Sequence, residues 1–247
     1  MPDLTWNKGY WDGDYDWDEA GEEWSSNWGS SEAQWFGSLY PRIHRFLPAG
    51  HLLEIAPGFG RWTRYLLQYT SGKYDGVDLS VECTAHCQRL FKDAPNTTFS
   101  VNDGKSLSAF DDDTYDLVFS FDSLVHAELD VHEQYVPQIL AKLKDDGVAF
   151  IHHSNWGSSN ETNPNTHCRG ESVSAEAYAD IVTQSGGQVI LQECLNWGTV
   201  AQIDAFTLFG KSKGENQEPF TTVSNPDFMA EANIIREVQN HYSKLKR

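Results

Sequence analysis

Apolar and polar positions along the chain follow a pattern that predicts alternating strands and helices. A short apolar run ends at Glu54, a glycine-containing turn follows, and aromatic and aliphatic residues then recur at helical spacing from Arg61 to Tyr69. Two more apolar segments end at Asp78 and Asp103. The same reasoning predicts helices at 35–46, 81–92, 131–144, 174–184 and 227–246, a turn at 145–147, and strands at 116–121, 148–151, 188–197 and 203–209. This alternation indicates the α/β class with a doubly wound, mostly parallel sheet.

Residues 1–35 have a different composition from the rest of the chain. They hold six of the nine tryptophans and nine acidic residues, but one lysine. A disordered acidic tail should be poor in aromatic residues, so we expect this segment to fold over the main domain, 36–247. Two interpretations stay open. The tryptophans fasten the segment to the domain, or some of them form a lid over cofactor and substrate, where Trp28 is a candidate substrate contact.

Composition limits the partners that we expect. The formal net charge is −18, from 36 acidic and 18 basic residues, so nucleic acid would be repelled. No apolar run approaches the ~20 residues that a membrane-spanning helix needs, and no basic segment followed by an apolar one marks a signal peptide. We therefore expect a soluble, cytoplasmic protein with no membrane partner and with reduced cysteines. A homo-oligomer stays open.

The loop after the first strand favours a cationic ligand over a phosphate. Gly58 and Gly60 allow the backbone to approach a ligand closely, and Ala56 stands where an earlier glycine is common. Glu54 enters this loop and would repel a pyrophosphate, but it suits a sulfonium and its amino group. Asp78, about twenty residues further on, can accept both hydroxyls of a ribose.

These segments resemble the successive motifs of the class I S-adenosylmethionine-dependent methyltransferases over roughly residues 36–211. The motifs that carry the resemblance are Glu54-Ile-Ala-Pro-Gly-Phe-Gly60, Gly76-Val-Asp78, Asn102-Asp103-Gly104 and Asp116-Leu-Val-Phe-Ser-Phe-Asp122. The resemblance implies a Rossmann-like sheet of seven strands with an antiparallel last pair, and S-adenosylmethionine as cofactor. It also implies the cofactor contacts: Glu54, Ala56, Gly58 and Gly60 at the methionine end, Asp78 at the ribose, Asp103 and Gly104 at the adenine, and Phe121 beside the methyl group.

The segment before the first strand resembles a narrower group of proteins. The run from Gly21 to Trp35, followed by Tyr40-Pro-Arg-Ile-His-Arg-Phe-Leu-Pro48, is similar to the amino-terminal segment of bacterial sugar O-methyltransferases of the mycobacterial methylmannose polysaccharide 1-O-methyltransferase type. This resemblance implies that the acceptor is a sugar or oligosaccharide hydroxyl.

Transfer of a methyl group to an alcohol needs a base, a metal or both. Asp122 and His126 follow the fourth predicted strand, and His152 and His153 end the fifth, so these positions supply catalytic candidates. We take His126 or His153 as the base and Asp122 as a further catalytic residue, because an imidazole titrates near neutrality. Neighbouring strand residues point to opposite faces, so only one of His152 and His153 should reach the site.

In metal-dependent relatives such as catechol O-methyltransferase, metal ligands follow the fourth and fifth strands. Transferred by position, Asp122, His152 and His153 would hold a metal here, but this chain has histidines where acids are expected. Mg²⁺ prefers oxygen ligands, so the resemblance leaves Mg²⁺ binding open.

The polar loop between His153 and Ser172 is longer than ordinary connections, which indicates a function. Its candidate contacts to a polyhydroxylated acceptor are Asn155, Asn160, Asn163, Asn165, His167 and Arg169. A loop that is merely solvated would have the same composition. The sequence favours an S-adenosylmethionine-dependent O-methyltransferase acting on a carbohydrate. Two alternatives remain: Mg²⁺-assisted methylation of a small phenolic acceptor, and a carbohydrate-binding protein without turnover.

Overall fold

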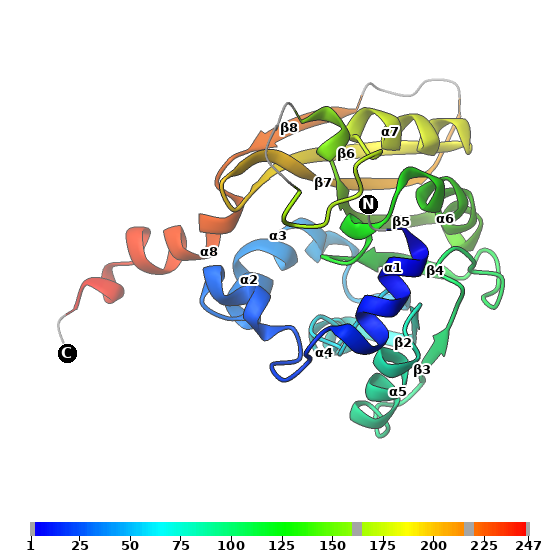
Figure 1. Ribbon diagram of the computed structural model, residues 1–247, viewed down its shortest axis with the longest axis horizontal. Helices are drawn as coiled ribbons and strands as arrows, with labels where there is room; N and C mark the ends of the chain where they lie inside the picture. Colours follow the sequence, from blue (N-terminus) through cyan, green and yellow to red (C-terminus); the bar gives the residue numbers. More distant parts are fainter. Residues whose placement is uncertain (1–2, 160–164, 215–219, 246–247) are drawn as a thin grey trace.

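The computed structural model describes residues 3–159, 165–214 and 220–245. A twisted sheet runs through the molecule, with helices on both faces (Figure 1). Its strand order is β3-β2-β1-β4-β5-β7-β6-β8. The strands are β1 Ala49–Ile55, β2 Thr70–Asp78, β3 Thr97–Val101, β4 Tyr115–Ser120, β5 Leu143–Ser154, β6 Gly187–Trp197, β7 Val200–Lys211 and β8 Thr221–Asn225.

The order in which successive strands are added to the sheet reverses between β1 and β4. From β1 the chain continues to β2 and β3 on one side, and β4 and β5 lie on the other, all parallel. Such a reversal leaves a crevice at the carboxyl ends of the strands. β7 pairs antiparallel with β5 and β6, and β8 adds a parallel strand beside β6.

Helical segments surround this sheet. The α-helices are α1 Leu4–Gly9, α2 Ser31–Gln34, α3 Tyr40–Ile43, α4 Thr63–Leu66, α5 Val81–Leu90, α6 Leu129–Lys142, α7 Ala175–Gln184 and α8 Glu231–Asn233. The 3₁₀ and π segments are η1 Tyr10–Asp14, η2 Glu22–Trp28, η3 Trp35–Leu39, η4 His44–Phe46, η5 Leu67–Tyr69, η6 Leu124–His126, η7 Trp156–Ser158, η8 Phe228–Ala230, η9 Ile234–Gln239 and η10 His241–Lys244. Serine caps fix two starts: Ser80 accepts the Cys83 N–H before α5, and Ser174 accepts the Ala177 N–H before α7.

Two apolar clusters, one on each face of the sheet, form the core. On one face, α6 and α7 cover β1, β4 and β5 through side chains such as Val136 and Val182. On the other face, the helical stretch 31–46, α4 and α8 cover the same strands, with Trp35 and Leu39 fully buried. None of the described helices is both long and apolar enough to cross a membrane.

The predicted class and sheet are confirmed, with three differences. The described residues form eight strands and not seven, because Thr221–Asn225 adds an edge strand. The predicted turn at 145–147 lies within β5, where the register against β4 shifts. The predicted helix at 227–246 is broken into short helical pieces by an extended Asn240, and its last residue, Lys246, lies outside the described residues.

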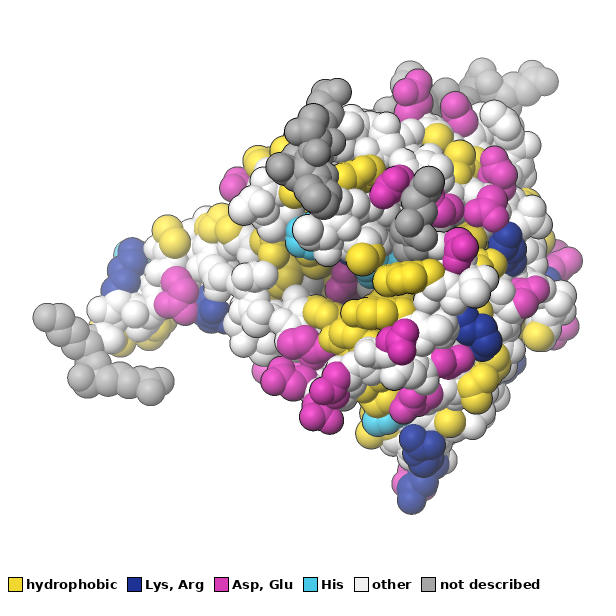
Figure 2. All heavy atoms as spheres, in the orientation of Figure 1, with side chains coloured by type: hydrophobic (Ala, Val, Ile, Leu, Met, Phe, Trp, Pro, Cys, Tyr) yellow, Lys and Arg dark blue, Asp and Glu magenta, His cyan; other side chains and the backbone are white. Residues whose placement is uncertain are grey.

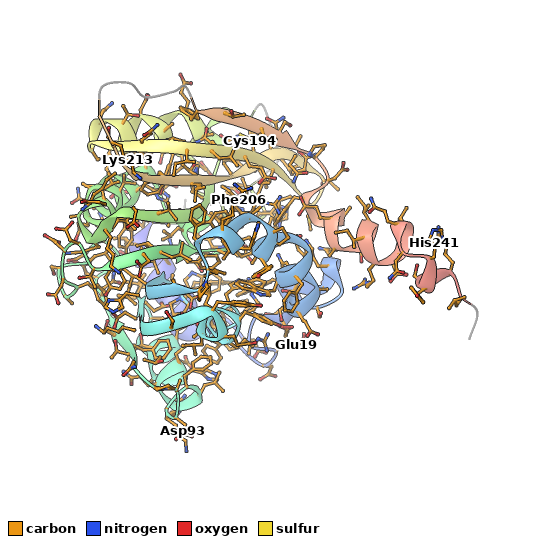
Figure 3. The ribbon with its side chains drawn as sticks, turned by 180° about the vertical axis from the view of Figure 1, so that it is seen from behind. Glu19, Asp93, Cys194, Phe206, Lys213 and His241 are labelled. Carbon is orange, nitrogen blue, oxygen red and sulfur yellow. The ribbon has the colours of Figure 1, made fainter. Side chains whose placement is uncertain are left out.

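The two ends of the described chain differ in how they pack against the body of the molecule. The segment after α8 projects away from the body (Figure 1), whereas the amino-terminal segment packs against the loop after β1 and the start of α5. Figure 3 shows His241 on this projecting arm and Phe206 within the body. Figure 2 shows acidic side chains spread over one face, around a group of hydrophobic side chains in its middle.

Candidate active site

A cavity lies at the carboxyl ends of β1, β2 and β4, where the strand order reverses. Five of the predicted cofactor residues line it: Ala56, Gly58, Asp78, Gly104 and Phe121. The Asp78 carboxylate accepts backbone N–H groups of Gly58 at 3.0 Å and of Ser80 at 2.8 Å. Burial raises the pKa of Asp78 to about 6. The cavity therefore combines a fixed acid with apolar walls.

The glycine at 58 is required by its surroundings. Its φ is +58°, and a Cβ there would lie 3.1 Å from the Trp17 ring. A side chain would fill the narrow space between the loop after β1 and the amino-terminal segment. Glycine at this position thus allows the Trp17 ring to pack closely against the backbone of the loop.

Three predicted cofactor residues do not line this cavity. The Glu54 carboxylate accepts hydrogen bonds from Thr63 Oγ1 at 2.5 Å and from the Tyr74 hydroxyl, and burial raises its pKa to about 7. Gly60 is needed for packing, since a Cβ would lie 2.6 Å from the Phe91 ring. Asp103 is exposed and accepts backbone N–H groups within its own loop. Glu54, Gly60 and Asp103 thus make internal contacts and do not line the cavity, and their ligand contacts stay predictions.

Two residues of the cavity have a strained backbone. Ala56 has φ 58° and Asp122 has φ 60°, in the left-handed region that side chains with a Cβ disfavour. Each such conformation costs on the order of 1–3 kcal/mol and occurs mainly at functional sites. The Ser123 hydroxyl donates to the Ala56 carbonyl at 2.8 Å, which joins the two loops.

A buried ion pair lies against the same cavity. Arg61 Nη2 donates to Asp122 Oδ2 at 2.7 Å, and both side chains are almost fully buried. The guanidinium carbon lies 5.0 Å from the Trp24 ring and 4.6 Å from the Trp62 ring. The sequence analysis missed Arg61, although a cation directly after the last glycine of this loop was a visible signal.

The amino-terminal segment forms part of the wall of the cavity. Trp11, Trp17 and Trp24 line it, and Trp17 stacks on Phe59 of the loop after β1 with ring centroids 4.3 Å apart. Asp12 accepts the Val81 N–H at the start of α5. Trp28 and Trp35 are fully buried in the core, as the first interpretation predicts, whereas the place of Trp11, Trp17 and Trp24 at the cavity leaves the lid a prediction.

A second cavity adjoins the first and shares Trp11, Trp24 and Asp122 with it. Half of its lining comes from the amino-terminal segment, and the other half from the loops after β4 and β5 and from Trp197 at the end of β6. Of the predicted residues, His126, His167 and Arg169 line it. Six of its fourteen lining residues are Trp or Tyr: Trp6, Tyr10, Trp11, Tyr15, Trp24 and Trp197.

His126 has one ring nitrogen fixed. Its Nδ1 lies 2.8 Å from the Cys168 carbonyl oxygen, which can only accept, so Nδ1 carries the proton. The Nε2 atom is then an acceptor, and no hydrogen bond joins it to the part of the chain that the structure describes. Burial and the nearby Arg169 charge lower the pKa of His126 to about 4. His126 is therefore neutral near pH 7, but it is a weaker base than the ordinary imidazole that the sequence analysis assumed.

A buried network lies beneath the second cavity. His152 Nδ1 accepts the backbone N–H of Asp122 at 3.1 Å, so its Nε2 carries the proton and faces Asp204 at 3.4 Å. Arg169 binds the same carboxylate at 2.8 and 2.7 Å. Burial opposes ionisation, but Arg169 and His152 hold the pKa of Asp204 well below its usual range. This network supports Asp122 in its strained conformation.

The structure contradicts His153 as the base. His153 is fully buried on the opposite face of β5, stacked on Tyr178 with ring centroids 3.9 Å apart, and its Nε2 contacts Thr207 Oγ1. The predicted metal ligands Asp122, His152 and His153 therefore do not converge, because neighbouring strand residues point apart. Within the described ranges, no three His, Cys, Asp or Glu side chains come together as a metal site.

Two predicted substrate contacts are also internal. Trp28 is buried against Phe228, to whose carbonyl its indole N–H donates at 3.1 Å. Asn155 donates to the Gln202 carbonyl and accepts the Ala175 N–H, which fixes the start of α7. Asn165 bonds to the backbone of Arg169 within the loop. Asn160 and Asn163 lie outside the described residues.

Comparison with known proteins agrees with this geometry. Residues 52–147 match the family described as Methyltransferase domain. No curated protein is significantly similar to the chain in sequence. Among solved structures, the DhpI–SAH complex has a TM-score of 0.57 at 18% identity, covering 86% of this chain and 97% of that one. The PH0226 protein from Pyrococcus horikoshii OT3 has a TM-score of 0.56 at 19% identity, covering 71% and 88%.

A third similar structure is described as a putative sarcosine dimethylglycine methyltransferase from Galdieria sulphuraria. Its TM-score is 0.55 at 12% identity, and the match covers 72% of this chain and 84% of that one. At such identities these structures show the fold, which is the Rossmann-like methyltransferase fold with an antiparallel pair in a mixed sheet. The family match identifies residues 52–147 as a methyltransferase domain, for which S-adenosylmethionine is the methyl donor.

Proposed function

We propose that the protein is an O-methyltransferase that methylates a hydroxyl of a sugar or oligosaccharide. The observation that carries the proposal is the second cavity. It adjoins the first cavity at Asp122 and combines aromatic faces with polar side chains. Aromatic faces pack well against the C–H faces of a sugar, while His167, Arg169 and Glu23 offer hydrogen bonds to its hydroxyls. The resemblance of the amino-terminal segment to sugar O-methyltransferases supports the same acceptor.

The proposed donor site is the first cavity. Asp78 would accept the ribose hydroxyls, the backbone from Ala56 to Gly58 and the Phe121 ring would lie near the methionine end, and Gly104 would face the adenine. The bound donor supplies a methyl group activated by a sulfonium. Residues 1–35 would act as a lid over both cavities, since the two share Trp11 and Trp24.

In this proposal His126 is the general base. Its neutral Nε2 accepts the hydroxyl proton while the acceptor oxygen is held beside the donor cavity. We expect His126→Ala to lower kcat by about 10²- to 10⁴-fold, while calorimetry shows unchanged affinity for S-adenosylhomocysteine. Undiminished turnover in the variant would remove His126 from the mechanism.

The acceptor class is tested with one panel of compounds. Sugars, oligosaccharides, catechols and small amines are incubated with labelled donor, each with and without a chelator. We expect label in the sugars and no effect of the chelator. Labelling of catechols alone, lost on chelation, would instead support Mg²⁺-assisted methylation of a phenol. Sugar binding without any turnover would support a non-catalytic carbohydrate-binding protein.

A further inference from the structure

We propose that the second cavity recognises a positively charged nitrogen on the acceptor, and that Glu23 binds this ammonium group. The inference rests on the proposed function, which it narrows to a sugar that carries an amino group away from the hydroxyl to be methylated. Glu23 then determines which acceptor is selected, while His126 keeps its role at the hydroxyl.

The balance of charges in the second cavity is the first step of the argument. Its charged lining residues are Glu23, Asp122 and Arg169. Asp122 pairs with Arg61, and Arg169 pairs with Asp204. Both histidines of the lining are neutral near pH 7, because burial lowers their pKa values. Within the described ranges no ion pair joins Glu23 to a cation, so the cavity keeps one uncompensated negative charge.

The bonding of the Glu23 carboxylate is the second step. Its Oε1 accepts a hydrogen bond from the Tyr15 hydroxyl, whereas its Oε2 is buried and accepts none from the residues that the structure describes. Burial and the Glu23 charge raise the pKa of Tyr15 above its usual range, so Tyr15 keeps its proton and holds the carboxylate in place. A buried carboxylate oxygen without a donor costs free energy. Because Glu23 lines the cavity, an ammonium group bound there can supply both the missing donor and the opposite charge.

The aromatic rings around this carboxylate are the third step. Tyr15 lies 5.1 Å from Trp24 and 5.7 Å from Tyr10 between ring centroids, and Tyr10 stacks on Trp6 at 4.8 Å. The four rings therefore form one connected cluster in the cavity wall. The faces of aromatic rings attract cations, and the attraction grows when water is excluded. A neutral sugar packs on such rings as well, but it leaves the charge of Glu23 without a partner.

The size and the two sides of the cavity fit an acceptor that bridges Glu23 and His126. The volume is about 370 Å³, which lies in the range of small-molecule sites. Glu23 belongs to η2 of the amino-terminal segment, and His126 belongs to η6 after β4, so they come from the two halves of the lining. The formal net charge of −18 also favours the approach of a cationic acceptor over an anionic one.

Two small probes test the ammonium site without assuming any particular sugar. Cyclohexylammonium and cyclohexanol have the same ring and differ in charge. Calorimetry near pH 7, with the full-length chain and bound S-adenosylhomocysteine, measures both affinities. We expect the ammonium to bind about 10- to 100-fold more tightly than the alcohol, and Glu23→Gln to reduce this preference to within about 3-fold. Unchanged affinity for S-adenosylhomocysteine shows that the variant is folded, because Glu23 does not line the first cavity.

A second measurement uses amino sugars as acceptors. Glucosamine, galactosamine and mannosamine are compared with glucose, galactose and mannose in the presence of labelled donor. We expect kcat/KM to be about 10- to 100-fold higher for the amino sugars, with the label on oxygen. Glu23→Gln should raise KM for the amino sugars and leave kcat within about 3-fold. Glu22→Gln is the matched control, because Glu22 pairs with Arg64 and lines neither cavity, so it should change no preference.

Equal binding of the two ring probes, or a preference that Glu23→Gln leaves unchanged, would overturn the proposal. Label on the amino nitrogen would also overturn it, because that nitrogen would then lie at the methyl donor and not at Glu23. Label in the neutral sugars alone would refute the ammonium site and leave the proposed function standing. A preference for the ammonium that depends on Glu23, without label in any sugar, would support the ammonium site and refute the sugar acceptor.

Discussion

At the scale of single residues, His152 and His153 show how the direction of a side chain decides its chemistry. They are neighbours on β5, yet His152 lies under the strained Asp122 and His153 packs against α7. Strand geometry alone predicts that they point to opposite faces. It does not predict that both are fully buried with their rings in internal contacts, because this depends on Asp204, Thr207 and Tyr178, which lie far away in sequence.

This placement predicts that His153 matters for stability and not for catalysis. His153→Ala should lower the free energy of unfolding by about 2–4 kcal/mol, because it removes a buried ring and leaves the Thr207 hydroxyl with one partner fewer. The kcat per folded molecule should stay unchanged. Denaturant unfolding and single-temperature kinetics with the same preparation check both points. A loss of kcat like that expected for His126→Ala would show that His153 takes part in catalysis and does not only stabilise the fold.

The first cavity, the proposed donor site, was predictable in part for a similar reason. Ala56, Gly58, Asp78 and Gly104 stand at strand ends, and the order of strands and helices brings such ends together. The direction of the Glu54 carboxylate depends on Thr63 and Tyr74, which no local pattern connects to it.

At the scale of elements, strands were easier to predict than helices. The buried strands β1, β2, β4 and β7 have apolar runs that a turn residue ends, so their positions follow from the sequence. β8 is short and mostly exposed, and it is a strand because β6 offers it a partner. The segment from Asp227 onward has helical spacing, but few of its residues are buried, so packing does not hold it in one continuous helix.

The layer formed by α6, α7 and β5 should be sensitive to acid. It buries His132 of α6 beside His153 and Tyr178. Burial lowers the pKa of His132 to about 4 and that of His153 to about 3, below the usual 6.5. The unfolded chain therefore binds more protons than the folded chain between pH 6.5 and 4. Stability is fully present above pH 6.5 and is lost as the pH falls through this window.

Glu54 and Asp78 act in the opposite direction, because their folded pKa values are raised. Their contribution to stability is present at low pH and is lost as the pH rises through about 6 to 7.

A variant isolates the effect of one histidine. His132→Phe should reduce the loss of unfolding free energy between pH 6.5 and pH 5 by about 1–2 kcal/mol relative to the unmodified chain. Urea unfolding at both pH values measures this difference. Identical pH slopes in the two proteins would show that His132 does not titrate in this way.

At the scale of the whole molecule, the amino-terminal segment lines both cavities together with the loops that follow the strands. Its composition indicated that the segment packs against the domain, but not at which place. The place depends on Phe59, Arg61 and His126, which the tryptophans contact and which lie far from them in sequence. It supplies half of the second cavity and covers the first. A donor bound in the first cavity, as proposed, would contact this segment, so donor binding and packing of the segment should be coupled.

This coupling predicts that the donor protects the segment from proteolysis. At 100 times its dissociation constant, a ligand that binds only the closed state stabilises that state by about 2.7 kcal/mol, which corresponds to about 100-fold less opening. Limited chymotrypsin digestion with S-adenosylhomocysteine should therefore slow cleavage around Tyr15 and Trp17 by up to about this factor. Cleavage at Tyr242, which is 81% exposed on the projecting arm, is the internal control and should not change. Protection at both places would indicate general stabilisation or inhibition of the protease, and equal cleavage at Tyr15 with the ligand bound would show that the segment does not close over the donor.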